Sequence, residues 1–148
     1  MPEVSVAFCS KEERINLVSN KETVLLELCD DIDRILISED GWKTHIFYPF
    51  KVFDCTREFE STDNQAKAIA EYIGSHFTGE KNILVQCTYG EVRSVAVAIG
   101  IACAWSGDCI ETIRDGQRVD GWDFIHSDVF MSRTSSWISQ YLTDNSSS

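Results

Sequence analysis

The chain has 148 residues, of which 43% are hydrophobic and 25% charged, and its formal net charge is −11. A length of this order predicts a single domain with one core. The negative charge opposes binding to nucleic acid or to anionic lipid, because both need clustered Lys and Arg side chains. We therefore expect neither a nucleic-acid partner nor a membrane partner.

The cysteines and the chain ends bear on compartment and domain limits. No apolar run approaches the roughly 20 residues of a membrane span, and the N-terminus lacks a signal-peptide pattern. These features predict a cytoplasmic monomer whose six cysteines are free thiols. There is no Cys-x-x-Cys pair and the histidines are scattered, which argues against a structural zinc site. We expect the domain to span residues 1–143 and the polar residues 144–148 to form a frayed tail.

The first elements along the chain are predicted to alternate between strand and helix. Apolar residues alternate over 4–8, as in a strand, and Ser10 with Glu13 has the capping-box spacing that begins a helix. That helix is expected to carry Ile15, Leu17 and Val18. The apolar runs 23–28 and 44–50 predict two buried strands, with a short strand and a turn over 31–42 between them.

The second half of the chain continues this alternation. Thr62 and Gln65 form another capping box, and an apolar stripe at helical spacing follows up to Phe77. Residues 83–87 predict a central strand, and 94–105 a helix buried on all sides with a glycine cap at 106–108. Residues 109–119 and 127–142 are interpreted as amphipathic helices. The predicted fold is α/β, with a mostly parallel central sheet and helices on both faces.

The most informative residues lie between the predicted central strand and the buried helix that follows it. Ligands bind such sheets beyond the carboxyl ends of the strands, and Cys87 is predicted to lie there. The backbone N–H groups of 87–93 can curl around an anion at a helix N-terminus, with Gly90 allowing the tight curl. The same position and a nearby arginine favour a reactive thiolate. Arg93 has the planar fork that holds two oxygens of a phosphoryl group.

The segment Cys87-Thr88-Tyr89-Gly90-Glu91-Val92-Arg93-Ser94 resembles the Cys-x5-Arg-Ser/Thr signature of cysteine-dependent protein phosphatases, most closely their dual-specificity branch. The similarity covers roughly residues 44–106, and the compact layout is similar to prokaryotic and phage members. It implies a dual-specificity phosphatase-like α/β fold. It also implies hydrolysis of phosphomonoesters, including phosphotyrosine and other phosphoprotein residues, through a cysteinyl-phosphate intermediate, without metal or any other cofactor.

The resemblance also implies a role for each matching residue. Cys87 is the nucleophile, and Ser94 assists the departure of its sulfur. The phosphate-binding residues are Thr88, Tyr89, Gly90, Glu91, Val92 and Arg93. Asp54, which lies 33 residues before Cys87 and ahead of the capped helix, matches the general acid, which then acts as a base on water. Asp63 is the next candidate for this role.

Two residues depart from the family pattern. Gln86 stands where the family usually has a histidine, which implies a reduced activity. Glu91 adds a carboxylate to the loop, but its side chain is expected to point outward, because the N–H groups of the loop converge inward. The loop contains no lysine, which favours a phosphoprotein or a singly phosphorylated substrate over a highly anionic phosphoinositide.

Three other functions fit parts of the same pattern. The chain fits a module of the same fold that binds phosphorylated residues without turnover. A cysteine loop of this kind also occurs in rhodanese-like sulfur transfer. Finally, Asp31-x-Asp33 after an apolar strand faintly resembles the aspartate-nucleophile, Mg²⁺-dependent phosphohydrolases, although a solvated acidic turn fits these residues better.

The remaining cysteines are interpreted mainly as packing residues. Cysteine is among the most buried residue types. We expect four of them to lie in the core: Cys9, Cys29, Cys103 and Cys109. The role of Cys55, next to Asp54, stays open.

Overall fold

The structure, a computed structural model, describes residues 4–29, 41–49, 59–77, 82–87, 93–106, 110–115, 117–121 and 129–145. The strands are β1 (Ser5–Ser10), β2 (Thr23–Cys29), β3 (Thr44–Pro49), β4 (Asn82–Cys87), β5 (Ile110–Arg114) and β6 (Gln117–Asp120). The helices are α1 (Lys11–Ile15), α2 (Phe59–His76), α3 (Arg93–Ile101) and α4 (Val129–Asn145), and a π-helix over Ala102–Ser106 continues α3.

The described strands form one six-stranded sheet in the order β3-β2-β4-β1-β5-β6. The pairs β3–β2, β2–β4, β4–β1 and β1–β5 are parallel, and only β5–β6 is antiparallel. The sheet is therefore mixed but mostly parallel, as the alternation of strands and helices predicts. β4 occupies a central position between β2 and β1, so the residue at its carboxyl end lies in the middle of the sheet edge.

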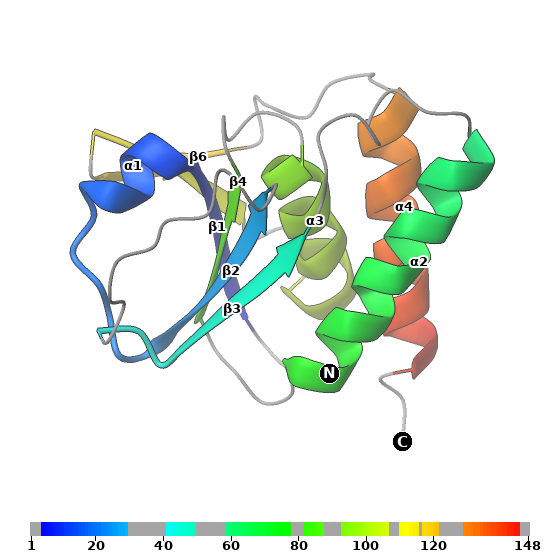
Figure 1. Cartoon of the computed structure of the whole chain (residues 1–148), viewed down its shortest axis with the longest axis horizontal. Coiled ribbons are helices and arrows are strands. Elements are labelled where there is room, and N and C mark those ends of the chain that lie inside the picture. Colours follow the sequence, from blue (N-terminus) through cyan, green and yellow to red (C-terminus); the bar gives the residue numbers. More distant parts are fainter. Residues whose placement is uncertain are drawn as a thin grey trace.

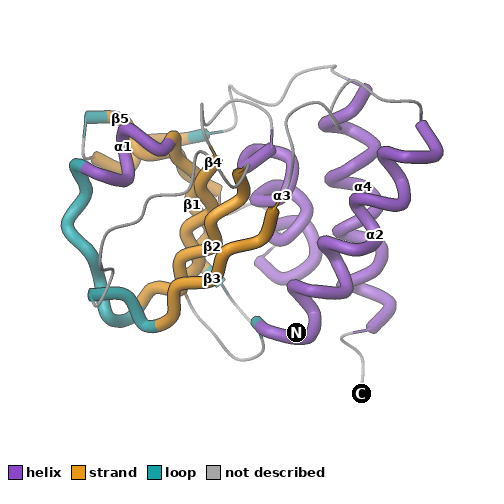
Figure 2. Tube along the Cα trace, viewed as in Figure 1, coloured by secondary structure: helices purple, strands orange, loops and turns teal. Residues whose placement is uncertain are grey.

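The two faces of the sheet are covered unequally. Figure 1 shows α2, α3 and α4 on one side of the sheet and α1 alone on the other. α3 packs directly against β1 and β4, and α4 packs against both α2 and α3 (Figure 2). Helices thus lie on both faces, as expected, but in the described part of the chain the second face has a single helix of five residues.

The core consists of two apolar layers, because successive strand residues point to opposite faces. The larger layer joins alternate residues of β1, β2 and β4, such as Phe8, Leu26 and Val85, to the three long helices. The smaller layer contains Ala7, Cys9, Leu25, Leu84 and Ile113, with Trp42 packed over it. Of the described helices, none is long and apolar enough to cross a membrane.

Several predicted elements are confirmed with changed limits. Ser10 caps α1, with its Oγ accepting a hydrogen bond of 3.1 Å from the Glu13 N–H. The helix ends at Ile15, however, and the side chains of Ile15 and Val18 are 54% and 87% exposed. They are not core residues, and Arg14 is the buried residue of this helix instead.

The two longest helices extend beyond their predicted limits. α2 begins at Phe59, so Thr62 and Gln65 lie inside the helix and do not cap its start. The apolar stripe that predicted α2 is confirmed, since Ile69, Ile73 and Phe77 are buried. α4 extends to Asn145 and so includes the first two residues of the predicted tail at 144–148.

The helix predicted over 109–119 is wrong. The chain forms the hairpin β5–β6 there, with Asp115 at a φ of 51° in the turn. An Asp-Gly pair is a strong hairpin signal, because both turn residues take positive φ in the type I′ turn that matches strand twist. The spacing of Ile110 and Ile113 fits one face of a helix, and both residues can also be buried in a strand. The spacing alone therefore does not distinguish a helix from a strand.

Candidate active site at the carboxyl end of the central strand

Cys87 is the last residue of β4 and projects towards the face covered by the long helices. Its side chain is 2% exposed, and it lies beside Ser10, the last residue of β1, in the strand register. This is the predicted location: the end of a central parallel strand, where loops lead into helix N-termini. The thiol is therefore buried at the carboxyl end of β4 and is not exposed on the surface of the protein.

The first two residues of α3 complete the described part of the site. Arg93 and Ser94 are 3% and 0% exposed, and both belong to the first turn of the helix. The Sγ of Cys87 lies 3.1 Å from the Oγ of Ser94. In the neutral thiol the sulfur donates this hydrogen bond, and in the thiolate the serine hydroxyl donates it. The contact thus connects the end of β4 to the start of α3 across the loop between them.

The buried guanidinium of Arg93 gives this position a cationic character. A charge removed from water is stable only with polar or anionic partners. The first N–H groups of this nine-residue helix have no acceptor within the helix, and the N-terminus of a helix favours an anion. The structure therefore brings Cys87 and Ser94 into contact and places buried Arg93 at the start of the same helix.

The remaining predicted site residues lie outside the described residues. These are Asp54, Thr88, Tyr89, Gly90, Glu91 and Val92. The alternative metal ligands Asp31 and Asp33 lie outside as well, together with Cys55 and Cys109. Asp63 belongs to α2, but its side chain and that of Cys29 in β2 are not described.

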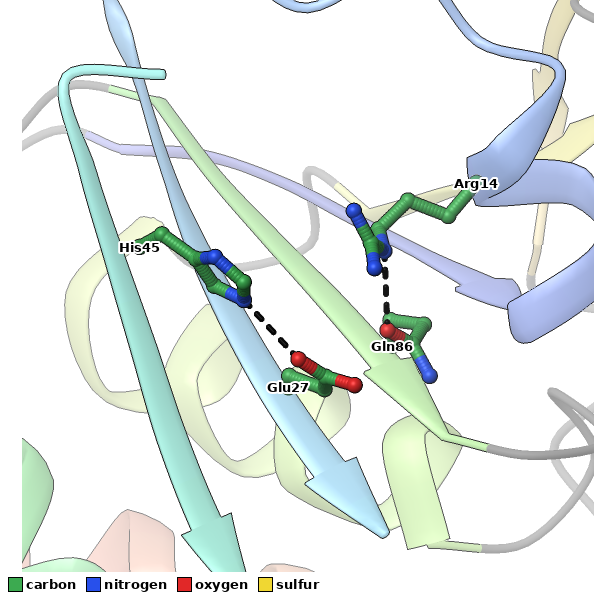
Figure 3. A network of polar contacts seen from close by, with 4 residues as sticks. All are labelled: Arg14, Glu27, His45 and Gln86. Carbon is green, nitrogen blue, oxygen red and sulfur yellow. Dashed lines mark hydrogen bonds and ion pairs between the residues drawn. The ribbon is translucent and has the colours of Figure 1, made fainter. Parts of the chain in front are cut away.

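Gln86 has a partner that sequence reasoning missed. The Nε of Arg14, on α1, donates a hydrogen bond of 3.0 Å to the Oε1 of Gln86. Figure 3 shows the arginine reaching down from α1 to the strand, on the face opposite α3. Gln86 is thus held by a cationic side chain. No sequence signal identifies the pair, because the two residues are 72 positions apart.

A second polar pair lies on the same face of the sheet. The Nε2 of His45, on β3, is 2.8 Å from the Oε1 of Glu27, on β2. Glu27 is fully buried and is the cross-strand neighbour of Gln86 (Figure 3). Polar side chains from α1, β4, β2 and β3 therefore form a row beneath the carboxyl end of the sheet.

The described cysteines differ in environment. Cys9, Cys87 and Cys103 are free thiols, as predicted. Burial raises the pKa of the Cys9 thiol and nearby Cys87 raises it further, while Arg14 opposes the rise. Cys9 is therefore a neutral core residue, as expected. The core assignment of Cys103 is wrong: this side chain is exposed, on the π-helix that continues α3.

A cavity of about 430 Å³ lies against α4. It is lined by Cys103 and by polar α4 residues between Ser135 and Asp144. Cys87, Arg93 and Ser94 do not line it, and its wall has a carboxylate but no cation. This cavity is therefore separate from the candidate phosphate site and poorly suited to an anion.

Comparison of the chain with protein-family models, with curated proteins and with solved structures finds no match.

Proposed function

We propose that this chain is a cysteine-dependent, metal-independent phosphatase with a dual-specificity phosphatase-like fold, acting on phosphoproteins or similar phosphomonoesters in the cytoplasm. The observation that carries the proposal is the hydrogen bond between the Cys87 thiol and the Ser94 hydroxyl beside buried Arg93. These three residues join the end of a central strand to the start of a buried helix. Their spacing is that of the Cys-x5-Arg-Ser motif, and the contact between Cys87 and Ser94 supports the proposal.

In the proposed reaction, the Cys87 sulfur attacks phosphorus and the bond to the leaving oxygen breaks. Arg93 holds two phosphoryl oxygens and stabilises charge on them. Asp54 gives a proton to the leaving oxygen and then takes one from the water that hydrolyses the thiophosphate. Ser94 stabilises the thiolate that departs in this second step.

A generic aryl phosphate assay in EDTA tests the proposal. We expect turnover by the wild-type protein, complete loss in Cys87→Ser, and a loss of ~10² or more in Arg93→Lys, because lysine lacks the bidentate fork. Cys103→Ser is the matched control, since it makes the same change at an exposed cysteine. Activity that disappears in EDTA would contradict the metal-independent mechanism and favour a metal site at Asp31 and Asp33.

A specific observation supports the second candidate, a module that binds phosphorylated residues without turnover. Gln86 stands in place of a histidine and is engaged by Arg14, so no imidazole lies beside the thiol on this strand. Tight tungstate or vanadate binding without turnover is the outcome this candidate predicts.

The assignment of Asp54 has its own test. Asp54→Asn should lower the rate ~10² or more for substrates with poor leaving groups, and much less for p-nitrophenyl phosphate, whose leaving group needs little protonation. Asp63→Asn is the comparison variant. A rate that falls in Asp63→Asn and not in Asp54→Asn would move the role to Asp63. A phosphopeptide panel with Cys87→Ser as a trap would then identify the substrate class.

A further inference from the structure

The cavity against α4 has the size of a ligand site and no role in the proposed phosphatase reaction. Its volume of about 430 Å³ falls within the range of ~300–1,000 Å³ that is typical of small-molecule sites. Figure 1 shows α3 and α4 side by side, with the C-terminal end of α4 away from the arrowheads of β2 and β3. Cys87 lies at the carboxyl end of the parallel strand β4 and does not line the cavity. A ligand in the cavity would therefore leave the candidate phosphate site open.

The walls of the cavity belong to two helical segments that are held together by a close contact. A Cβ atom at Gly100 would lie 2.8 Å from Ile138 atoms and 3.0 Å from the carbonyl oxygen of Ser135, so α3 and α4 approach closely there. The π-helix Ala102–Ser106 follows directly and contributes Cys103 to the cavity. π-Helical turns are rare and occur frequently at functional sites. Because its walls are packed helices and not loops, the cavity keeps a defined shape.

The lining of the cavity is polar and rich in hydroxyl groups. Apart from Cys103, the described lining residues are polar residues of α4: Ser135, Ser136, Ser139, Gln140, Thr143 and Asp144. Serine and threonine hydroxyls both donate and accept hydrogen bonds. An apolar ligand would take such groups out of water without replacing their hydrogen bonds. The wall therefore suits a ligand that carries hydroxyl groups of its own.

The charge of the cavity comes from Asp144, in the last turn of α4. Its carboxylate accepts a long hydrogen bond of 3.4 Å from the Nε2 of Gln140, and a carboxylate has about four acceptor sites, so sites for further donors remain. The C-terminal end of a helix is itself partly negative and favours a cation. No described lining residue is cationic, and the sequence contains no Lys or Arg after Arg133. The electrostatic complement of this cavity is therefore a positively charged ligand.

We propose that the cavity between the π-helix and α4 binds a small hydroxylated amine, such as an amino sugar. The ammonium group pairs with Asp144, at the negative end of α4, and the ligand hydroxyls bond to the serine and threonine side chains of the wall. This site is separate from the Cys87 site, and the proposal does not depend on the phosphatase function.

Cys103 provides a reporter of occupancy, because its thiol lines the cavity and is accessible to solvent. Desolvation raises the pKa of this thiol, so it is uncharged at neutral pH and does not compete with Asp144 for the amine. The experiment measures the rate at which iodoacetamide alkylates Cys103 in the full chain at neutral pH, with the Cys103 peptide followed by mass spectrometry. Three sugars of similar size and different charge are compared: glucosamine, glucose and glucuronate.

We expect glucosamine to slow the alkylation of Cys103 in a saturable manner. Glucose, which keeps the hydroxyl groups but lacks the positive charge, should need about twofold to fivefold more for half-protection, the effect of an exposed ion pair. Glucuronate carries a negative charge and should not protect. Equal protection by glucosamine and glucose, or no saturable protection by glucosamine, would overturn the proposal.

Asp144→Asn tests the charged partner directly. The glucosamine concentration for half-protection should rise about twofold to fivefold in this variant, and the value for glucose should not change. Asp120→Asn is the matched control, because it removes the same charge from an exposed residue of the edge strand β6 that does not line the cavity. Reaction of the amine with iodoacetamide would slow both variants equally and is thereby separated from binding.

A folded Asp144→Asn protein with the half-protection of the control would also overturn the proposal. The comparison of the three sugars uses the wild-type protein, so it decides the question even if this variant does not fold. The alkylation assay requires no phosphatase turnover. Protection in a protein without turnover therefore contradicts the proposed function alone, and turnover without protection contradicts this proposal alone.

Discussion

The hydroxyl of Ser94 offers the sharpest test of the candidate site, because it makes one defined contact. Its Oγ lies 3.1 Å from the Cys87 Sγ, and both side chains are buried. A hydrogen bond to a charged group contributes ~1.5–3 kcal/mol, and each ~1.4 kcal/mol is a factor of ten in rate. In Ser94→Ala we therefore expect the steady-state rate of aryl phosphate hydrolysis to fall about 10- to 100-fold.

The step that slows should be hydrolysis of the thiophosphate, in which the thiolate is the leaving group. Rapid mixing of Ser94→Ala with p-nitrophenyl phosphate should show a burst of about one p-nitrophenol per active site before the slow steady state. Thr134→Val is the control, since it removes another fully buried hydroxyl, on α4, that is not in contact with Cys87. A steady-state rate for Ser94→Ala within about twofold of the control would contradict the role of this hydrogen bond, which predicts at least tenfold.

Three further predictions concern stability. Oγ1 of Thr134 is buried and, among the described residues, has no hydrogen-bond partner; Thr134→Val should stabilise the fold by ~1–3 kcal/mol, and an unchanged melting temperature would show that the hydroxyl is satisfied. A Cβ at Gly100 would lie 2.8 Å from Ile138 atoms, whereas one at Gly74 meets only ordinary contacts at 3.6 and 3.7 Å. Gly100→Ala should therefore destabilise by ~1–3 kcal/mol and Gly74→Ala stabilise by up to ~1 kcal/mol, both measured by urea unfolding, and equal effects would refute the close approach of α3 and α4. Burial raises the pKa of Cys9 above its ordinary value of 9.0, so the folded state keeps a proton that the unfolded chain loses. The free energy of unfolding should thus decline above pH 9.0 by up to ~1.4 kcal/mol per pH unit from this group, and an identical decline in Cys9→Ala would exclude Cys9 as its source.

Local patterns predicted the elements that carry the site. Alternating or continuous apolar residues identified β1, β2 and β4, and the helical stripe up to Phe77 identified α2. These patterns were sufficient because a buried strand or helix needs apolar residues at its own period, whatever its neighbours are. The motif from Cys87 to Ser94 likewise predicts a thiol and a hydroxyl at one strand end, and these two are in contact there, with Arg93 as the first residue of α3.

The incorrect predictions arose where a local pattern fits two structures. Ile110 and Ile113 suit a helix face or the buried side of a strand, and the structure pairs Arg114 with Gln117 across a hairpin in which Asp115 has a positive φ. Cys103 is exposed although its segment is almost entirely apolar, because the composition of a segment does not say which of its side chains face the core.

The sequence by itself therefore determined the α/β alternation and the chemical groups at the end of the central strand. Only the tertiary structure decided the strand order β3-β2-β4-β1-β5-β6, and with it which residues lie next to Cys87. That order places Ser10 beside Cys87 and Arg14 over Gln86, although these pairs are far apart in the chain. The physical reason is that strand order minimises the free energy of the whole sheet and its two covering layers, whereas a sequence pattern reports only the burial of each element on its own.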